Sequence, residues 1–280
     1  MREIAASTIT NAVAELCIRA NYDLGEDVQN ALRRALDMEE SPVGRDILQQ
    51  LIENAQIAHT ESVPMCQDTG FAVVFVELGQ DVHIVDGLLY DAINQGVSRG
   101  YAEGYLRKSI VSHPIERINT GDNTPAVIYT EIVPGDRLKI ILAPKGGGSE
   151  NMSGVKMLKP SEGIEGIRQF VLDLVKSAGS NPCPPIILGV GIGGTMDKAA
   201  LLAKKALLRN IGEPSSKEID ASIEEDLLQL VNRTGIGPAG LGGRVTALAV
   251  HVESFPCHIA SLPVAVNIQC HAARHKEIVL

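Results

Sequence analysis

Pro-Ile-Ile-Leu-Gly-Val-Gly-Ile-Gly-Gly-Thr-Met-Asp-Lys, residues 185–198, is the stretch that decides the expected fold. Its first part, Pro185–Val190, is a short apolar run typical of a buried strand. A glycine loop ends at Gly194, and a long helix is expected from there to about Arg209. A buried strand that leads through a glycine loop into a helix indicates a domain that mixes strands and helices.

The rest of the chain extends this pattern. Three apolar stripes with helical spacing fill the first 60 residues, and Phe71–Leu78 is rich in β-branched and aromatic residues, as strands are. Further helices are expected over 85–103, 164–175 and 218–232, and further strands near 245–253 and 262–268. The sequence predicts an α/β (mixed α+β) fold, with a helical N-terminal region followed by a mixed sheet with helices. We expect a single domain over 1–280 with a weak internal break near 210–217.

Two shorter segments carry turn signals. Pro134-Gly135-Asp136 separates the apolar runs Ala126–Val133 and Arg137–Leu142, which predicts an antiparallel hairpin. The segment 144–151, Pro-Lys-Gly-Gly-Gly-Ser-Glu-Asn, is too glycine-rich for a regular element. Three consecutive glycines are costly in backbone entropy, so they suit a backbone that passes close to a ligand or another chain.

Composition excludes several classes of function. The 280 residues carry a net charge of −9, with 3% aromatic residues and no Trp, which argues against a nucleic-acid binder. No apolar run is long enough for a transmembrane helix, so no membrane contact is expected. Acidic residues at Glu3, Glu15 and Asp23 stand where a secretory signal would be apolar. We therefore expect a cytoplasmic protein.

The cysteines favour roles other than disulfides. Their number is odd and their spacing wide, at Cys17, Cys66, Cys183, Cys257 and Cys270. Cys17 lies on an apolar helix face, whereas three of the others lie at junctions between elements. No spacing matches a structural zinc site or a ferredoxin. Unrelated buried thiols and a three-cysteine metal site both remain open on spacing alone.

The glycine loop also leaves alternatives open. Gly189, Gly191 and Gly194 form a literal G-x-G-x-x-G between a strand and a helix, which is the context of a dinucleotide site. A Rossmann unit needs a second strand that ends in an acid about 20 residues later, and residues 210–216 are a polar loop instead. A tight strand-to-helix turn and a backbone cradle for another anion are the other interpretations.

Four longer motifs carry a family resemblance. They are Pro-Met-Cys-Gln-Asp-Thr-Gly at 64–70, the glycine segment at 144–151, Gly-Val-Gly-Ile-Gly-Gly-Thr-Met-Asp-Lys-Ala at 189–199 and Cys-His-Ala-Ala-Arg-His at 270–275. Together they resemble the α part of class I, iron–sulfur-dependent fumarate hydratases. The related L-tartrate dehydratase α subunit shares them. The resemblance covers essentially the whole chain.

The resemblance implies a set of site residues. Cys66, Cys183 and Cys270 match the family's three ligands of a [4Fe–4S] cluster, and Cys257 then lies beside the cluster without binding it. The family's substrate-binding residues match Gln67, Asp68, Arg107 and Gly147. Asp68 and His258 match residues implied to act in catalysis, as positioning or proton-relay groups.

The resemblance also implies partners and an activity. Single-chain members carry a second domain with further arginines, a lysine and a proposed threonine base, none of which has a match here. We therefore expect a β subunit that carries the second half of the active site, a small dicarboxylate substrate and a heterotetramer. The expected reaction is the reversible hydration of fumarate to L-malate, a step of the tricarboxylic acid cycle, and the isolated chain is expected to be inactive.

Three other functions remain as alternatives. L-tartrate dehydratase would apply the same cluster to a substrate with a second hydroxyl. A nucleotide-binding dehydrogenase would use the glycine loop at 189–194. A structural or regulatory subunit would have lost the cluster, although all three cysteines are present.

Overall fold

The computed structural model describes residues 1–280, and the chain divides into two compact units. The first comprises 1–24, 54–147 and 274–280, and the second comprises 25–53 and 148–273. Each unit is therefore built from segments that are distant in sequence. The segment 210–217 lies inside the second unit, and none of the junctions between units falls there.

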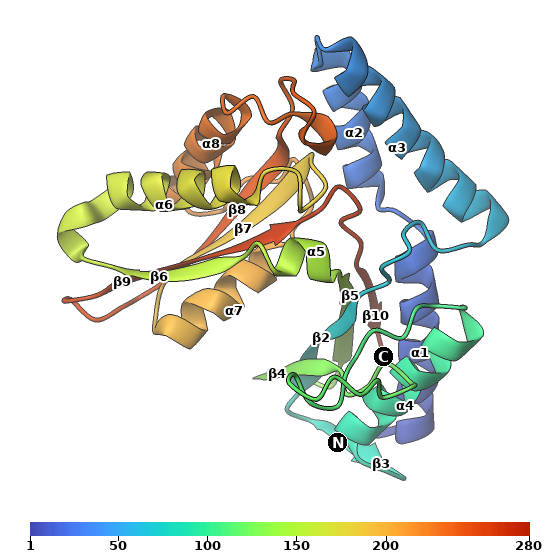
Figure 1. Cartoon of the computed structure of the whole chain (residues 1–280). Helices are drawn as coiled ribbons and strands as arrows, with labels where there is room; N and C mark the ends of the chain where they lie inside the picture. The colour runs from blue at the N-terminus through green and yellow to red at the C-terminus, as the bar shows by residue number, and fades with distance from the viewer. The chain divides into compact units, whose positions relative to one another are not determined.

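The first unit is a four-stranded sheet with two helices. Its sheet has the order β10-β5-β2-β4, and a separate two-stranded parallel sheet pairs β1 with β3. The bounds of these elements are β1 Arg2–Ala5, α1 Ala6–Tyr22, β2 Phe71–Gly79, β3 Val82–Val85, α4 Leu89–Glu103, β4 Val127–Val133, β5 Leu138–Lys145 and β10 Lys276–Val279. Helix α1 packs along α4 and against β5 and β10 (Figure 1).

The predicted hairpin between β4 and β5 is wrong. Both strands form, but β2 lies between them, parallel to β4 and antiparallel to β5. The reason lies in the core, because strand β2 is buried over Ala72–Val76 and pairs on both of its edges. The turn at 134–136 therefore joins two strands that sit on either side of a third.

The second unit is a sheet covered by helices on both faces. Its strands have the order β6-β9-β7-β8, with β7 parallel to β8 and antiparallel to β9. Helices α6 and α8 lie on one face of the sheet, and α7 lies on the other (Figure 1). The elements are α2 Glu26–Met38, β6 Gly154–Leu158, α6 Gly163–Ala178, β7 Ile186–Gly193, α7 Met196–Ala206, α8 Glu218–Asn232, β8 Ala247–Phe255 and β9 Leu262–Gln269. Short 3₁₀ turns occur at Pro160–Glu162 and Pro238–Gly240.

Two helices cross the junctions between the units. Helix α3 spans Pro42–Glu61, and the single helical turn α5 spans Gly147–Glu150. The turn α5 falls in the segment 144–151, which we expected to be irregular, and β5 runs on to Lys145. No helix combines the length and hydropathy that a membrane-spanning segment needs.

The expected glycine loop after β7 is mostly strand. Leu188 and Val190 point into the core shared with α6 and α8, whereas Gly189 and Gly191 face α7. A Cβ atom at Gly189 would lie 2.0 Å from the carbonyl oxygen of Ala203, and one at Gly191 would lie 2.0 Å from that of Ala199. These glycines let the α7 backbone pack directly on the strand, so the structure explains them without a nucleotide.

A buried carboxylate joins two loops of the second unit. Glu39 is 2% exposed, and its carboxylate accepts hydrogen bonds from the backbone N–H groups of Glu40, Ser41, Arg244 and Val245 at 2.9–3.0 Å. Burial raises the pKa of Glu39, but these backbone bonds outweigh it and lower the pKa below its usual value. The glycine-rich segment near Gly243 is therefore held to the turn between α2 and α3.

The fold class is confirmed as mixed α/β. The three N-terminal stripes form α1, α2 and α3, and the helix expected over 218–232 matches α8. The helix expected over 85–103 begins at Leu89, and the helix expected to about Arg209 ends at Ala206. The strands expected near 71–78, 245–253 and 262–268 form β2, β8 and β9.

Candidate functional site

The loop Cys66–Gly70, which leads from α3 into β2, is held by buried side chains. The Tyr101 hydroxyl shares its one hydrogen between the carbonyl oxygens of Thr69 and Gly70, which lie 2.8 and 3.0 Å from it. The Asn123 side chain donates to the Gly70 oxygen at 3.2 Å. Tyr101 and Asn123 are fully buried, and burial raises the pKa of Tyr101 far above its usual range. The Tyr101 hydroxyl therefore remains a donor, and these bonds hold the backbone at the Thr69–Gly70 end of the loop.

Asp68 lies at the centre of this loop. Its carboxylate accepts hydrogen bonds from the backbone N–H of Gly70 at 3.0 Å and from that of Gly147 at 2.9 Å. Its own carbonyl oxygen accepts one from Arg274 Nη2 at 2.6 Å. Two residues expected to bind substrate, Asp68 and Gly147, thus contact each other. Asp68 orients the glycine segment in this structure.

Arg107 is tied to the same loop through its backbone. The Arg107 N–H donates to Thr69 Oγ1 at 2.9 Å, and that hydroxyl donates back to the Arg107 oxygen at 3.2 Å. Both Arg107 and Gln67 are exposed side chains. Gln67 Oε1 lies 3.8 Å from Cys66 Sγ. The first unit therefore brings Cys66, Gln67, Asp68 and Gly147 together, with Arg107 anchored to the same loop.

Arg274 contributes a buried positive charge to this group. The residue is 5% exposed, and its Nη2 atom holds the Asp68 carbonyl. Its Nε and Nη1 atoms have no hydrogen-bond partner in the chain. Buried donors without a partner are uncommon, because they lose their hydration without compensation. The Arg274 guanidinium therefore keeps two unpaired donor atoms, buried from solvent, beside the backbone of Asp68.

The sequence did not point to two of these supporting residues. Tyr101 lies within an amphipathic helix, where the pattern predicts that an aromatic residue belongs to the hydrophobic core. Asn123 lies in the turn sequence Gly-Asp-Asn-Thr-Pro at 121–125 and has a positive φ of 63°. That turn composition is a weak signal, because it predicts a bend without predicting which loop the side chain will reach.

The second unit brings two cysteine loops together at one end of its sheet, where β7 begins and β9 ends. Cys183 precedes β7, and Cys270 follows β9. Because β7 and β9 are antiparallel, with Ile187 opposite Gln269, the start of one strand adjoins the end of the other. His271 Nδ1 lies 3.0 Å from the Cys183 carbonyl oxygen, which joins the two loops. Cys183 has a positive φ of 55° and an exposed side chain.

His258 lies at the opposite end of this sheet. It is in the loop between β8 and β9, and Gly193, the last residue of β7, pairs with Phe255 at that end. Strand β7 has eight residues, so the two ends are separated by roughly 25 Å. Within the unit, the structure does not bring His258 together with Cys183 and Cys270. The expected role of His258 in positioning or proton relay stays a prediction.

Comparison with known proteins gives the family. The family described as fumarate hydratase (Fumerase) matches residues 10–279. The chain belongs to the fumarate hydratase family. It is therefore a member of a family of hydro-lyases.

Individual members of the fumarate hydratase family carry a second name. A protein of Methanocaldococcus jannaschii, named provisionally as L(+)-tartrate dehydratase subunit alpha, is 47% identical over 95% of each chain. The L(+)-tartrate dehydratase subunit alpha of Escherichia coli strain UTI89 is 34% identical over 98% of this chain and 91% of its own length. That of Shigella sonnei is 33% identical over 100% of this chain and 93% of its own length.

The structure separates the five cysteines of this fumarate hydratase family member by environment. None is in a disulfide. Cys17 is fully buried in the core and burial raises the pKa of its thiol, which makes it a poor ligand. Cys257 shares the loop of His258, and its thiol donates to the Ser261 oxygen at 3.3 Å. The other three thiols, those of Cys66, Cys183 and Cys270, occupy solvent-reached loops.

Each of these three thiols has the chemistry of an iron–sulfur cluster ligand. Thiolates are the protein ligands that such clusters take, and all three loops are held by hydrogen bonds. Cys66 belongs to the first unit, and Cys183 and Cys270 belong to the second. No group of three or more His, Cys, Asp or Glu side chains is gathered in a way that could hold a single metal ion.

Proposed function

We propose that this chain is the α subunit of a two-chain [4Fe–4S] hydro-lyase that hydrates fumarate reversibly to L-malate. The observation that carries the proposal is the loop Cys66–Gly70, in a chain of the fumarate hydratase family. In this loop the Cys66 thiol lies 3.8 Å from the amide oxygen of Gln67, the Asp68 carboxylate holds the N–H of Gly147, and the Thr69 hydroxyl holds that of Arg107. A thiol of the kind that ligates iron is thus followed directly by an amide that can bind a carboxylate, and the guanidinium-bearing Arg107 is anchored to the same short segment.

In this proposal Cys66, Cys183 and Cys270 hold the cluster. Three thiolates leave one of the four irons without a protein ligand. When bound, such a cluster supplies a Lewis acid that polarises a substrate oxygen. Cytoplasmic location is part of the proposal, because cluster assembly needs cysteines that are kept reduced.

The residues of the first unit bind and orient the substrate. The exposed guanidinium of Arg107 pairs with one carboxylate, because its planar donors match two carboxylate oxygens. The amide of Gln67 donates to an oxygen of the substrate. Asp68 fixes the N–H of Gly147, so a proton-handling role for Asp68 requires it to exchange that bond for one to the substrate. We propose that the β subunit supplies the base that removes the proton from carbon and that the isolated α chain is inactive.

L-Tartrate is the second candidate substrate. The relatives cited above carry the name L(+)-tartrate dehydratase subunit alpha, which favours a dicarboxylate with two hydroxyl groups. The same names support a β subunit as the partner of this chain, and a heterotetramer is the proposed assembly. Assay of the α–β complex with fumarate, L-malate and L-tartrate decides between the two. Turnover of tartrate alone would overturn fumarate hydration and leave the hydro-lyase proposal in place.

Cluster binding is tested by anaerobic reconstitution of the full chain with iron and sulfide. We expect about four irons per chain in the wild type and clear loss of iron in Cys66→Ser, Cys183→Ser and Cys270→Ser. Cys257→Ser is the matched control, because this thiol is also exposed but lies at the far end of the sheet. Full iron content in all three variants would refute the ligand assignment.

A further inference from the structure

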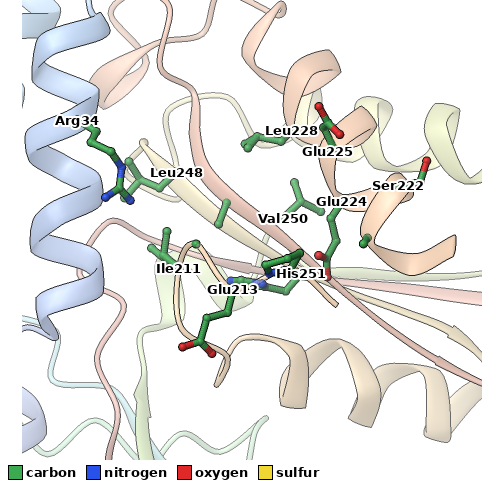
Figure 2. Close-up of a pocket in the computed structure, with 14 residues that line it drawn as sticks. Arg34, Ile211, Glu213, Ser222, Glu224, Glu225, Leu228, Leu248, Val250 and His251 are labelled. Carbon is green, nitrogen blue, oxygen red and sulfur yellow. The ribbon is translucent and has the colours of Figure 1, made fainter. Parts of the chain in front are cut away.

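A cavity lies wholly inside the second unit (Figure 2). It has a volume of about 460 Å³ and lies between α2, the segment Ile211–Pro214, α8 and β8. This volume is within the range of small-molecule sites, roughly 300–1,000 Å³. None of the residues assigned above to the cluster or to the substrate lines it. The proposed function therefore leaves this cavity without a role.

The base of the cavity carries a buried histidine without a partner. His251 lies on β8, is 3% exposed, and neither ring nitrogen has a hydrogen-bond partner in the chain. Figure 2 shows its ring between Glu213 and Glu224. Burial lowers the pKa of His251 to about 4, so the ring is neutral at neutral pH. A neutral imidazole offers one N–H donor and one acceptor, which suits a ligand amide or hydroxyl.

Charges of both signs border the cavity. Arg34, on α2, is exposed and makes no hydrogen bond or ion pair in the chain, unlike its neighbour Arg33, which donates to Asn30. Glu213 and Glu225 line other sides of the cavity and are also exposed (Figure 2). One cationic and two anionic groups around one cavity favour a ligand that itself carries both charges.

The third carboxylate is already compensated. Glu224 is 6% exposed and accepts hydrogen bonds from Arg209 at 2.6 Å, from the Val252 N–H at 2.8 Å and from the Ser215 N–H at 2.9 Å. It therefore holds the strand and the loop together and has little capacity left for a ligand. The remaining wall is apolar, with Ile211, Leu228, Leu248 and Val250.

We propose that this cavity binds a small zwitterionic amino acid whose side chain carries an uncharged amide or hydroxyl. Arg34 receives the α-carboxylate, Glu213 or Glu225 receives the ammonium group, and His251 pairs with the side-chain amide or hydroxyl. The aliphatic part of the ligand lies against the apolar wall. This binding is independent of whether the hydro-lyase substrate of the chain is fumarate or tartrate.

The test is calorimetric titration of the full 280-residue chain with L-glutamine as the probe. Three analogues each lack one recognised group. Glutaramate lacks the ammonium, 4-aminobutanamide lacks the carboxylate, and L-norleucine lacks the amide. We expect one saturable site for L-glutamine and at least about tenfold weaker binding of each analogue, since each loses a charged or hydrogen-bonded contact.

Variants assign the binding to this cavity. Arg34→Ala removes an exposed side chain and should weaken L-glutamine at least about tenfold, whereas the neighbouring Arg33→Ala should leave binding unchanged. In the NMR spectrum of the wild type, the ring signals of His251 should shift with the same saturation curve. Absence of saturable binding, equal binding by Arg34→Ala, or equal binding of glutaramate would each overturn the proposal. The titration needs neither cluster nor β subunit, so its failure is distinct from a failure of the proposed function.

Discussion

Replacement of Asp68 separates a positioning role from a catalytic one. The Asp68 carboxylate accepts two backbone hydrogen bonds, from Gly70 and Gly147. Hydrogen bonds to charged groups contribute roughly 1.5–3 kcal/mol each, and the half-buried position of Asp68 favours the lower end. Asp68→Ala removes both acceptors and should destabilise the loop by about 3 kcal/mol. Asp68→Asn retains one acceptor oxygen and should cost about half as much.

Amide hydrogen exchange at Gly147 reads this loss directly, because it reports the opening of one loop. If the carboxylate–amide bond accounts for about 1.5 kcal/mol, exchange should speed up roughly tenfold in Asp68→Ala. Gln67→Ala is the matched control, since the neighbouring side chain is exposed and makes no contact with Gly147. Exchange at Gly147 that is equal in Asp68→Ala and wild type would refute the reasoning and leave the carboxylate available for substrate.

Three further changes test other parts of the structure. The pKa of His251 is about 4 in the folded chain and 6.5 in the unfolded one, so the unfolded state binds more protons between these two pH values. The free energy of unfolding should therefore fall by roughly 3 kcal/mol from pH 7 to pH 4. In urea unfolding, His251→Leu should remove this part of the pH dependence. Glu39→Gln turns an amide N–H₂ toward backbone donors and should lower the free energy of unfolding of the second unit by roughly 3 kcal/mol, as measured by urea unfolding. Unchanged stability of the second unit would show that Glu39 does not anchor these loops. Gly191→Ala places a Cβ atom 2.0 Å from the Ala199 oxygen and should lower the yield of folded chain sharply, while normal thermal stability would show that α7 is free to move.

Local pattern was sufficient for most elements. The helical spacing of apolar residues predicted α1, α2, α3 and α6, and the β-branched run predicted β2, because these signals depend only on neighbouring residues. The four motifs also indicated the family by themselves. Residue chemistry within a motif could be inferred in the same way, as for the thiol, amide and carboxylate at Cys66, Gln67 and Asp68.

Only the tertiary structure decided which strands pair and which side chains pack together. The strand between β4 and β5 comes from more than 40 residues upstream of the turn, so no local signal could reveal it. Gly189 and Gly191 resemble a phosphate loop in sequence, yet their lack of a Cβ atom serves the approach of α7. Likewise, antiparallel pairing of β7 with β9 brings the loop of Cys183 beside the loop of Cys270, whereas His258 lies at the other end of the sheet. Sequence records which groups are present, whereas burial and strand pairing over long separations decide which groups meet, because each contact depends on the whole packed core.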